Sequence, residues 1–170
     1  MMIQINFSHK NLLIFLGLSS IFALLGAYIA QFGFNLKPCI LCLYQRKPFF
    51  AIIAVTLLAI FIFKNYKYQK LGLFACQAIL LSNIAISGYH VGVEKKIFEG
   101  PSSCSVSQDL TEITNIEDLE KALSKASTVK CSEPAFVFLK ISMAGWNLLY
   151  CLGLFIFCLI ASRTKKISTI

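Results

Sequence analysis

Long runs of apolar residues alternate along the chain with shorter polar segments. Four of these runs, at about 11–30, 42–63, 71–91 and 136–161, contain almost no charged residue. A helix needs about 20 apolar residues to cross a bilayer, so each run is long enough to do so. The pattern predicts an all-α membrane protein in which residues 1–170 form a single domain, a bundle of four transmembrane helices.

The first apolar run lies where a secretory signal would lie. It is longer than the apolar core of a signal peptide, and Tyr28, Ile29 and Ala30 offer no small-x-small cleavage pattern. We therefore expect the first run to be a membrane anchor.

Composition supports the membrane class. Hydrophobic residues make up 57% of the chain, charged residues only 14%, and the mean hydropathy is +0.72. The hydrophobic and charged fractions lie well outside the usual balance of a water-soluble domain. A lipid bilayer is therefore the expected surroundings of the chain.

The net charge of +8 raises the question of a nucleic-acid partner, but the basic residues form no single patch. Five lysines lie among the acidic residues between the third and fourth runs, whereas further basic residues precede the first run, follow the fourth, or fill the loop at 64–70, and none of these three regions contains an acidic residue. By the positive-inside rule this loop and both termini are cytoplasmic. The loops at about 31–41 and 92–135 then face outward, and no nucleic acid is expected to bind.

The second outward loop contains the acidic residues and one amphipathic pattern. Apolar residues recur there at helical spacing, and Asn115 is suited to cap the segment. We expect a short amphipathic helix that lies on the bilayer or packs on the outer ends of the transmembrane helices. Its apolar face would consist of Ile113, Ile116, Leu119 and Leu123.

The chain contains seven cysteines, and this topology sorts them into two groups. Four lie in or next to the outward loops, the side on which disulfides persist, whereas cytoplasmic thiols are kept reduced. These four are Cys39, Cys42, Cys104 and Cys131. The other three, Cys76, Cys151 and Cys158, lie inside apolar runs, where we expect them to act as small buried hydrophobic side chains.

Cys39 and Cys42 form a Cys-x-x-Cys pair where the first outward loop meets the second apolar run. Pro38 is suited to the first turn of a helix, which puts the pair at a helix N-terminus, where the backbone favours a thiolate. Arg46 follows Cys42 by four residues and so lies on the same helix face, placed to hold a thiolate or an anionic ligand. The alternative is that Arg46 only extends to the lipid headgroups.

Two cysteine pairs on one side of a membrane can form a relay if a thiolate of one attacks the disulfide of the other. Cys104 and Cys131 lie on a loop that a soluble protein can reach, although a purely stabilising loop disulfide is the alternative. Cys39 and Cys42 lie at the membrane edge, where a lipid-soluble oxidant such as a quinone has access. A metal site there would need further ligands. We expect no metal site, because His90 is the only outward histidine.

Several of these residues together resemble one known family. The sequence Lys37-Pro38-Cys39-Ile40-Leu41-Cys42-Leu43-Tyr44-Gln45-Arg46 begins an apolar run, and the other matching positions follow in order over most of the chain. The chain is similar to the disulfide-bond formation protein B family (DsbB) of bacterial inner membranes. The other matching positions are Gln31, His90, Cys104, Cys131 and Met143 to Trp146.

The resemblance implies a complete electron path. A soluble periplasmic thioredoxin-like oxidase of the DsbA type would attack the Cys104/Cys131 disulfide and form a mixed disulfide with Cys104. Cys131 would then attack Cys39 and release Cys42, which passes electrons to ubiquinone or menaquinone. Arg46 would stabilise the accumulating charge. His90 and Gln31 would help to hold the quinone ring.

One departure and three other functions stay open. Glu94 occupies a position where many family members have Gln, which affects the loop near the quinone. A paralogue with a dedicated partner is one alternative. A conduit that carries electrons outward would need a cysteine pair reachable from the cytoplasm, and the membrane cysteines form no pair in sequence. A four-span scaffold or chaperone stapled by Cys104 and Cys131 is the non-enzymatic alternative.

Overall fold

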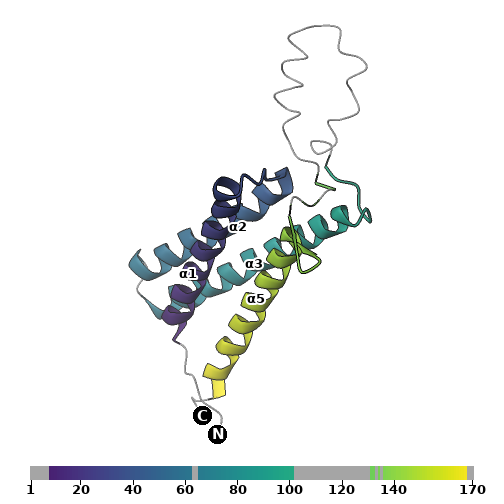
Figure 1. Ribbon diagram of the computed structural model, residues 1–170. Helices are drawn as coiled ribbons and strands as arrows, with labels where there is room; N and C mark the ends of the chain where they lie inside the picture. Colours follow the sequence, from purple (N-terminus) through teal and green to yellow (C-terminus); the bar gives the residue numbers. More distant parts are fainter. Residues whose placement is uncertain (1–7, 63–64, 102–130, 133, 135, 168–170) are drawn as a thin grey trace, which may run out of the picture.

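The computed structural model describes residues 8–62, 65–101, 131–132, 134 and 136–167 (Figure 1). Within these residues, four helices are long and apolar enough to cross a membrane. The predicted four-helix transmembrane bundle of an all-α membrane protein is therefore confirmed. The helices are α1 (His9–Tyr28), α2 (Ile40–Leu57), α3 (Tyr66–Glu94) and α5 (Met143–Ile167).

Two of the helices continue into a wider turn. The π-helical segment η1 (Ile29–Gly33) extends α1, and the similar segment η2 (Leu58–Ile62) extends α2. In such a segment the backbone bonds span five residues rather than four, which rotates the following side chains around the helix axis. Segment η1 contains Gln31, so this local widening sets where the Gln31 amide lies.

The core of the bundle is formed by one side of each helix. Leu12 and Leu16 of α1, Ile52 of α2 and Leu80 of α3 are completely buried in one cluster. Large apolar residues on the outer sides, such as Phe22, remain exposed, which suits a surface that contacts lipid. The three membrane cysteines are also fully buried in this cluster, as the sequence predicted: Cys76, Cys151 and Cys158.

Small residues let the helices approach closely. A Cβ atom added at Gly72 of α3 would lie 2.9 Å from the Cβ atom of Ala59 in η2, and one at Gly17 of α1 would lie 3.0 Å from Oγ1 of Thr56 in α2. Membrane helices associate through such contacts because lipid gives no hydrophobic gain for burying larger side chains. These two glycines therefore set the spacing of α1, α2 and α3.

The fourth helix begins later than expected. We predicted a helix from residue 136, but β1 (Val137–Phe138) and β2 (Ile141–Ser142) form an antiparallel hairpin instead, with Val137 opposite Ser142. The hairpin turn uses two residues with positive φ, Leu139 at 52° and Lys140 at 64°, as a tight two-residue turn requires.

The start of α5 has a local cause. The hydroxyl oxygen of Ser142 accepts a hydrogen bond, 3.2 Å long, from the backbone N–H of Gly145, which is the usual way in which a serine caps a helix. The helix accordingly begins at Met143. Hydropathy missed this boundary because an apolar hairpin and an apolar helix have similar compositions.

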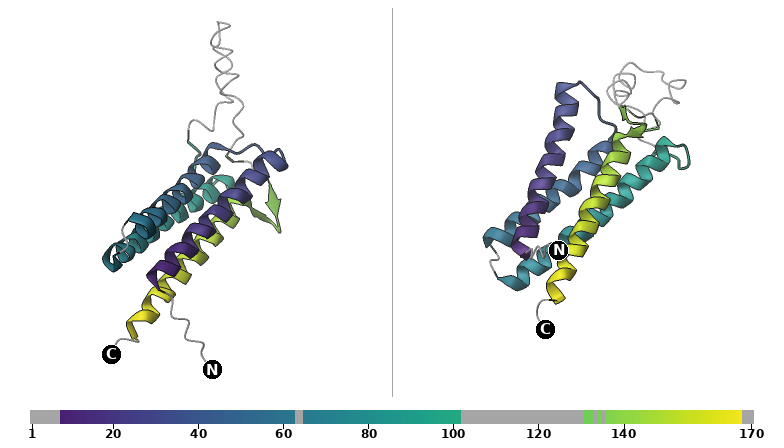
Figure 2. Two further views of the ribbon diagram at one scale, coloured as in Figure 1. Left: turned by 90° about the vertical axis from the view of Figure 1, so that its left-hand side faces the viewer. Right: turned by 60° about the horizontal axis from the view of Figure 1, so that its bottom comes forward.

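The ends of the helices gather into two groups (Figures 1 and 2). Helix α1 begins and α5 ends at one end of the bundle, whereas the start of α2, the end of α3 and the hairpin lie together at the other end. Helix α3 packs against both α2 and α5, and α1 packs against α2. Cys104 and the amphipathic helix expected near Asn115 lie outside the described residues.

Candidate functional site

Cys39 caps the N-terminus of α2. Its extended backbone (φ −74°, ψ 169°) ends the preceding loop, and its sulfur accepts a hydrogen bond from the backbone N–H of Cys42 at 3.3 Å. We had expected Pro38 in the first helical turn, but it precedes the cap. Cys42 lies in that first turn, so the Cys-x-x-Cys spacing brings both sulfurs to the end of one helix.

The surroundings of Cys39 favour its thiolate. The Cys42 thiol donates to the Cys39 sulfur, with the two sulfur atoms 2.9 Å apart, and Nε2 of His90 lies 3.4 Å from the same sulfur. The bond from Cys42 is the main cause that lowers the pKa of Cys39 well below its ordinary value, and His90 adds to it, whereas burial opposes the shift. In the dithiol form Cys39 is therefore the member of the pair that ionises more readily.

His90 belongs to α3 and is 2% exposed. Its Nδ1 lies 3.2 Å from the side-chain nitrogen of Gln45 in α2, and its Nε2 lies 3.8 Å from a carboxylate oxygen of Glu94, one helical turn further on. Glu94 in turn accepts a hydrogen bond from the hydroxyl of Ser142. This chain of polar contacts fixes the imidazole between α2, α3 and the hairpin.

Gln45 was missed by the sequence analysis. It is 6% exposed and contacts His90, which places its amide inside the site rather than at the lipid surface. The available signal was an uncharged polar side chain within an apolar run, because polar groups inside a membrane usually face the protein interior. Asn147 of α5 was missed for the same reason; its amide donates to the hydroxyl of Ser87 in α3 at 2.8 Å.

Arg46 is held by α1 and η1. One guanidinium nitrogen donates to the Gln31 side-chain oxygen at 2.6 Å, another donates to the carbonyl of Ala27 at 3.4 Å, and the group lies 5.0 Å from the centre of the Tyr28 ring. The guanidinium is thus bound within the protein, whereas the alternative interpretation had it extend to the headgroups. Gln31 was expected to contact a ligand, and the structure brings it to Arg46.

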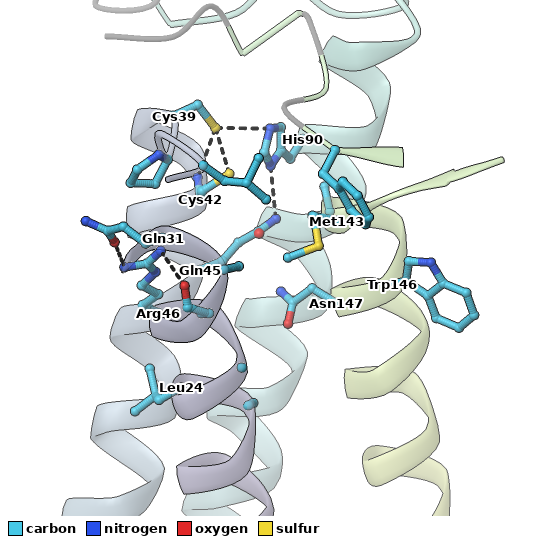
Figure 3. Close-up of a pocket in the computed structure, with 18 of the residues that line it drawn as sticks. Leu24, Gln31, Cys39, Cys42, Gln45, Arg46, His90, Met143, Trp146 and Asn147 are labelled. Carbon is cyan, nitrogen blue, oxygen red and sulfur yellow. Dashed lines mark hydrogen bonds between the residues drawn. The ribbon is translucent and has the colours of Figure 1, made fainter. Parts of the chain in front are cut away.

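These side chains surround one cavity of about 420 Å³ between the four helices (Figure 3). Most of its wall is apolar, with a few polar side chains among the lining residues. An apolar cavity with a few polar groups is the common form of a small-molecule site. Five of the six predicted site residues that the structure describes line the cavity: Gln31, Cys39, Cys42, Arg46 and His90.

Cys131 is the described cysteine of the second pair. It is 1% exposed and disulfide-bonded, and it packs in a small buried cluster with Cys39, Leu41 of α2 and Val93 of α3. The structure therefore brings Cys131 next to Cys39 although 91 intervening residues separate them in the sequence. The other described cysteines, Cys39, Cys42, Cys76, Cys151 and Cys158, are free thiols.

Comparisons with known proteins agree on one family. The family model described as "Disulfide bond formation protein DsbB" matches residues 9–161. Proteins named "Disulfide bond formation protein B" from Cupriavidus metallidurans and Shewanella frigidimarina are 31% and 28% identical, over 77% and 78% of this chain and 79% and 77% of their own lengths.

A third relative, "Uncharacterized protein RP370" from Rickettsia prowazekii, is 34% identical over 81% of this chain and 78% of its own length. The family match extends from the first residue of α1 into the last turns of α5, so it includes all four helices and every described residue of the site. Together with four membrane-spanning helices around a Cys-x-x-Cys site, this match shows that the chain belongs to the DsbB family of membrane disulfide bond formation proteins.

Proposed function

We propose that this protein is a quinone-dependent protein disulfide oxidoreductase. It reoxidises a soluble periplasmic thioredoxin-like oxidase of the DsbA type and passes the electrons to a membrane quinone, which sustains disulfide formation in exported proteins. One observation supports this function most strongly: Cys131 lies in the same buried cluster as Cys39, and Cys39 and Cys42 line the cavity that contains Arg46.

The thiol steps follow from attack of a thiolate on a disulfide. A thiolate of the soluble partner attacks Cys104 of a Cys104/Cys131 disulfide, forms a mixed disulfide and releases Cys131. The partner's second thiolate displaces Cys104, so the partner leaves oxidised and the Cys104/Cys131 pair holds two electrons. Cys131 then attacks Cys39 of a Cys39/Cys42 disulfide and releases the Cys42 thiolate, and closure of the Cys104/Cys131 disulfide leaves Cys39 and Cys42 reduced.

The cavity fits a quinone ring. Its apolar wall suits the ring and the first part of an isoprenoid tail, Arg46 offers N–H donors to a carbonyl oxygen, and His90 lines the same cavity. Bound ubiquinone or menaquinone would accept two electrons and two protons there and become a quinol. Arg46 stabilises negative charge beside Cys42, Gln31 orients the Arg46 guanidinium, and His90 holds Cys39.

The proposed site faces the periplasm, and the protein spans the bacterial inner membrane with both termini in the cytoplasm. The distribution of basic residues supports this orientation, since they flank the end of the bundle where α1 begins and α5 ends. Cys39, His90 and Cys131 lie at the opposite end. Disulfides at that end would persist, because the periplasm is an oxidising compartment.

The decisive experiment is quinone reduction by the purified protein with a reduced thioredoxin-like partner, followed by the quinone absorbance. We expect steady turnover by the wild type and none by Cys42→Ser, because the serine oxygen cannot form the disulfide that releases two electrons. Cys76→Ser is the matched control, since Cys76 is a fully buried thiol in the core cluster, away from the cavity.

Undiminished turnover by Cys42→Ser would refute the proposal. Absence of turnover in folded wild-type protein, with quinone and several reduced partners present, would favour a scaffold or chaperone instead. Mass spectrometry of a Cys131→Ala variant incubated with the oxidised partner separates these cases further. The free Cys104 thiolate should attack the partner's disulfide, release the partner's second thiol and form a mixed disulfide that Cys131 is no longer present to resolve.

A further inference from the structure

The two free thiols of the site and the imidazole of His90 form a group of metal-ligand atoms. The sulfur atoms of Cys39 and Cys42 and a ring nitrogen of His90 all lie within 4.8 Å of one another. They come from α2, its cap and α3, and Figure 3 shows them converging at one end of the cavity. We propose that the dithiol form of this site binds one thiophilic divalent cation of the Zn²⁺ type, with Cys39, Cys42 and His90 as its three protein ligands.

The distances suit such an ion. Tetrahedral zinc has Zn–S bonds of about 2.3 Å and Zn–N bonds of about 2.0 Å, which separates a ligand sulfur from a ligand nitrogen by about 3.5 Å. The Cys39 sulfur lies 3.4 Å from Nε2 of His90. The two sulfurs, 2.9 Å apart, would have to separate by about 1 Å, which a small rotation of the Cys42 side chain provides.

The surroundings of the ligands also suit a cation. Metal-binding histidines usually form a second hydrogen bond that orients the ring, and Gln45 lies 3.2 Å from Nδ1 of His90. The side-chain amide can present its oxygen to an Nδ1–H when Nε2 binds the ion. A divalent ion with two thiolates and a neutral imidazole has no net charge, which suits a largely buried position at the membrane edge.

The site is built for reversible binding. All three ligands line the cavity, so an ion can enter from it, and three protein ligands leave a fourth position open toward the same space. Binding releases the thiol protons and moves no electrons. If the proposed function is correct, the bound ion also stops the relay at its dithiol stage, because neither sulfur is then free to form a disulfide.

The test uses Co²⁺ as a spectroscopic probe and needs neither quinone nor partner, so it is independent of the proposed function. The protein is reduced with a phosphine, freed of the phosphine under inert gas, and titrated with Co²⁺. We expect one ion per chain, with thiolate-to-cobalt charge-transfer bands and the intense visible bands of four-coordinate Co²⁺. Addition of Zn²⁺ should remove these bands.

Matched variants identify the ligands. Cys42→Ser and His90→Gln should weaken Co²⁺ binding by at least about ten-fold, because loss of a group that merely orients a ligand already costs 10- to 100-fold. Cys76→Ser, in the core cluster, should bind Co²⁺ like the wild type. Wild-type protein with the Cys39/Cys42 disulfide closed keeps every side chain and should bind none, so this control does not depend on any variant folding.

Three results would show that the Cys39 and Cys42 thiols do not hold the ion. These are equal Co²⁺ affinity in the dithiol and disulfide forms, equal affinity in Cys42→Ser, and bands that Cys76→Ser abolishes. An unchanged affinity and spectrum in folded His90→Gln would reject the three-ligand site in favour of the thiols alone.

Discussion

At the scale of single residues, the cap position of Cys39 determines the chemistry of the Cys-x-x-Cys pair. The sulfur receives a backbone N–H and a thiol from Cys42, and it lies beside Nε2 of His90. Sequence alone places both cysteines at a helix N-terminus and predicts a lowered pKa for the pair. Only the structure shows which sulfur accepts these bonds, because the direction of each side chain depends on where the loop ends and the helix begins.

A pH dependence follows from the lowered pKa of Cys39. In the dithiol form, the alkylation rate of Cys39 should persist below the ordinary thiol pKa of about 8.5 and should fall only as the pH drops through the lowered pKa. Cys42→Ala removes the main donor, so its profile should shift to higher pH. The measurement is iodoacetamide labelling in the presence of a chelator, with mass spectrometry of the Cys39 peptide.

The same shift has a defined effect on stability. An acid whose pKa is lower in the folded state stabilises that state above its unfolded pKa, and this contribution is lost as the pH falls through the folded value. The dithiol protein should therefore lose stability as the pH falls from about 8.5 through the lowered pKa of Cys39. A midpoint near pH 8.5 in the alkylation profile of wild-type Cys39 would contradict the lowered pKa on which both predictions depend.

Contacts between elements determine how the site is held. Arg46 of α2 binds Gln31 of η1 and the carbonyl of Ala27 in α1, so its guanidinium connects two elements as well as lining the cavity. The sequence predicted a functional Arg46 from its spacing to Cys42. It could not predict the bond to Gln31, because the π-helical segment that places Gln31 has no signature in the hydropathy pattern.

Arg46→Lys tests this connection. Lysine keeps the charge but lacks the planar fork that reaches both acceptors. The KM for quinone should therefore rise by about ten-fold or more, because this is the effect of losing one hydrogen bond to a charged group. The matched control is Lys47→Arg, because the Lys47 ammonium lies over the Tyr44 ring and not in this cavity. The measurement is steady-state quinone reduction, and an Arg46→Lys enzyme with unchanged KM and kcat would show that the fork is not needed.

The hairpin before α5 illustrates what hydropathy cannot resolve at the scale of elements. Residues 137–142 are part of an apolar run, yet positive φ angles at Leu139 and Lys140 and the Ser142 cap turn them into a hairpin. Ser142 also donates to Glu94, so the hairpin is tied to the end of α3 beside His90. This link joins the start of α5 to the candidate site.

The whole molecule depends on close approach of the helices. Gly72→Ala should destabilise the bundle by about 1–3 kcal/mol, the usual cost of overpacking, because the new methyl group would lie 2.9 Å from Ala59. Gly88→Ala, in the same helix with no atom within 4 Å of the new Cβ, should be neutral or stabilising by up to about 1 kcal/mol. Unfolding in mixed detergent compares the two, and equal stability would show that α3 and η2 separate without cost.

The sequence by itself determined the class of the protein, the number of its membrane helices and the residue types of its chemistry. Bilayer thickness sets the length of an apolar run, and charge between the runs indicates orientation, so both can be read locally. The Cys-x-x-Cys pair and Arg46 were found because i and i+4 neighbours on one helix are local as well.

The family resemblance grouped His90 and Cys131 with the Cys-x-x-Cys pair, but tertiary structure alone decided how these distant residues contact one another. His90 of α3 and Cys131 of the segment before the hairpin lie beside Cys39, and Gln45 in the second turn of α2 contacts His90. We expected no metal site because the sequence offers the cysteine pair only one outward histidine, and the fold places Nε2 of this histidine 3.4 Å from the Cys39 sulfur. The physical reason is that glycine contacts, caps and π-helical turns set the rotation of each helix about its axis. No repeating pattern along the sequence predicts this rotation.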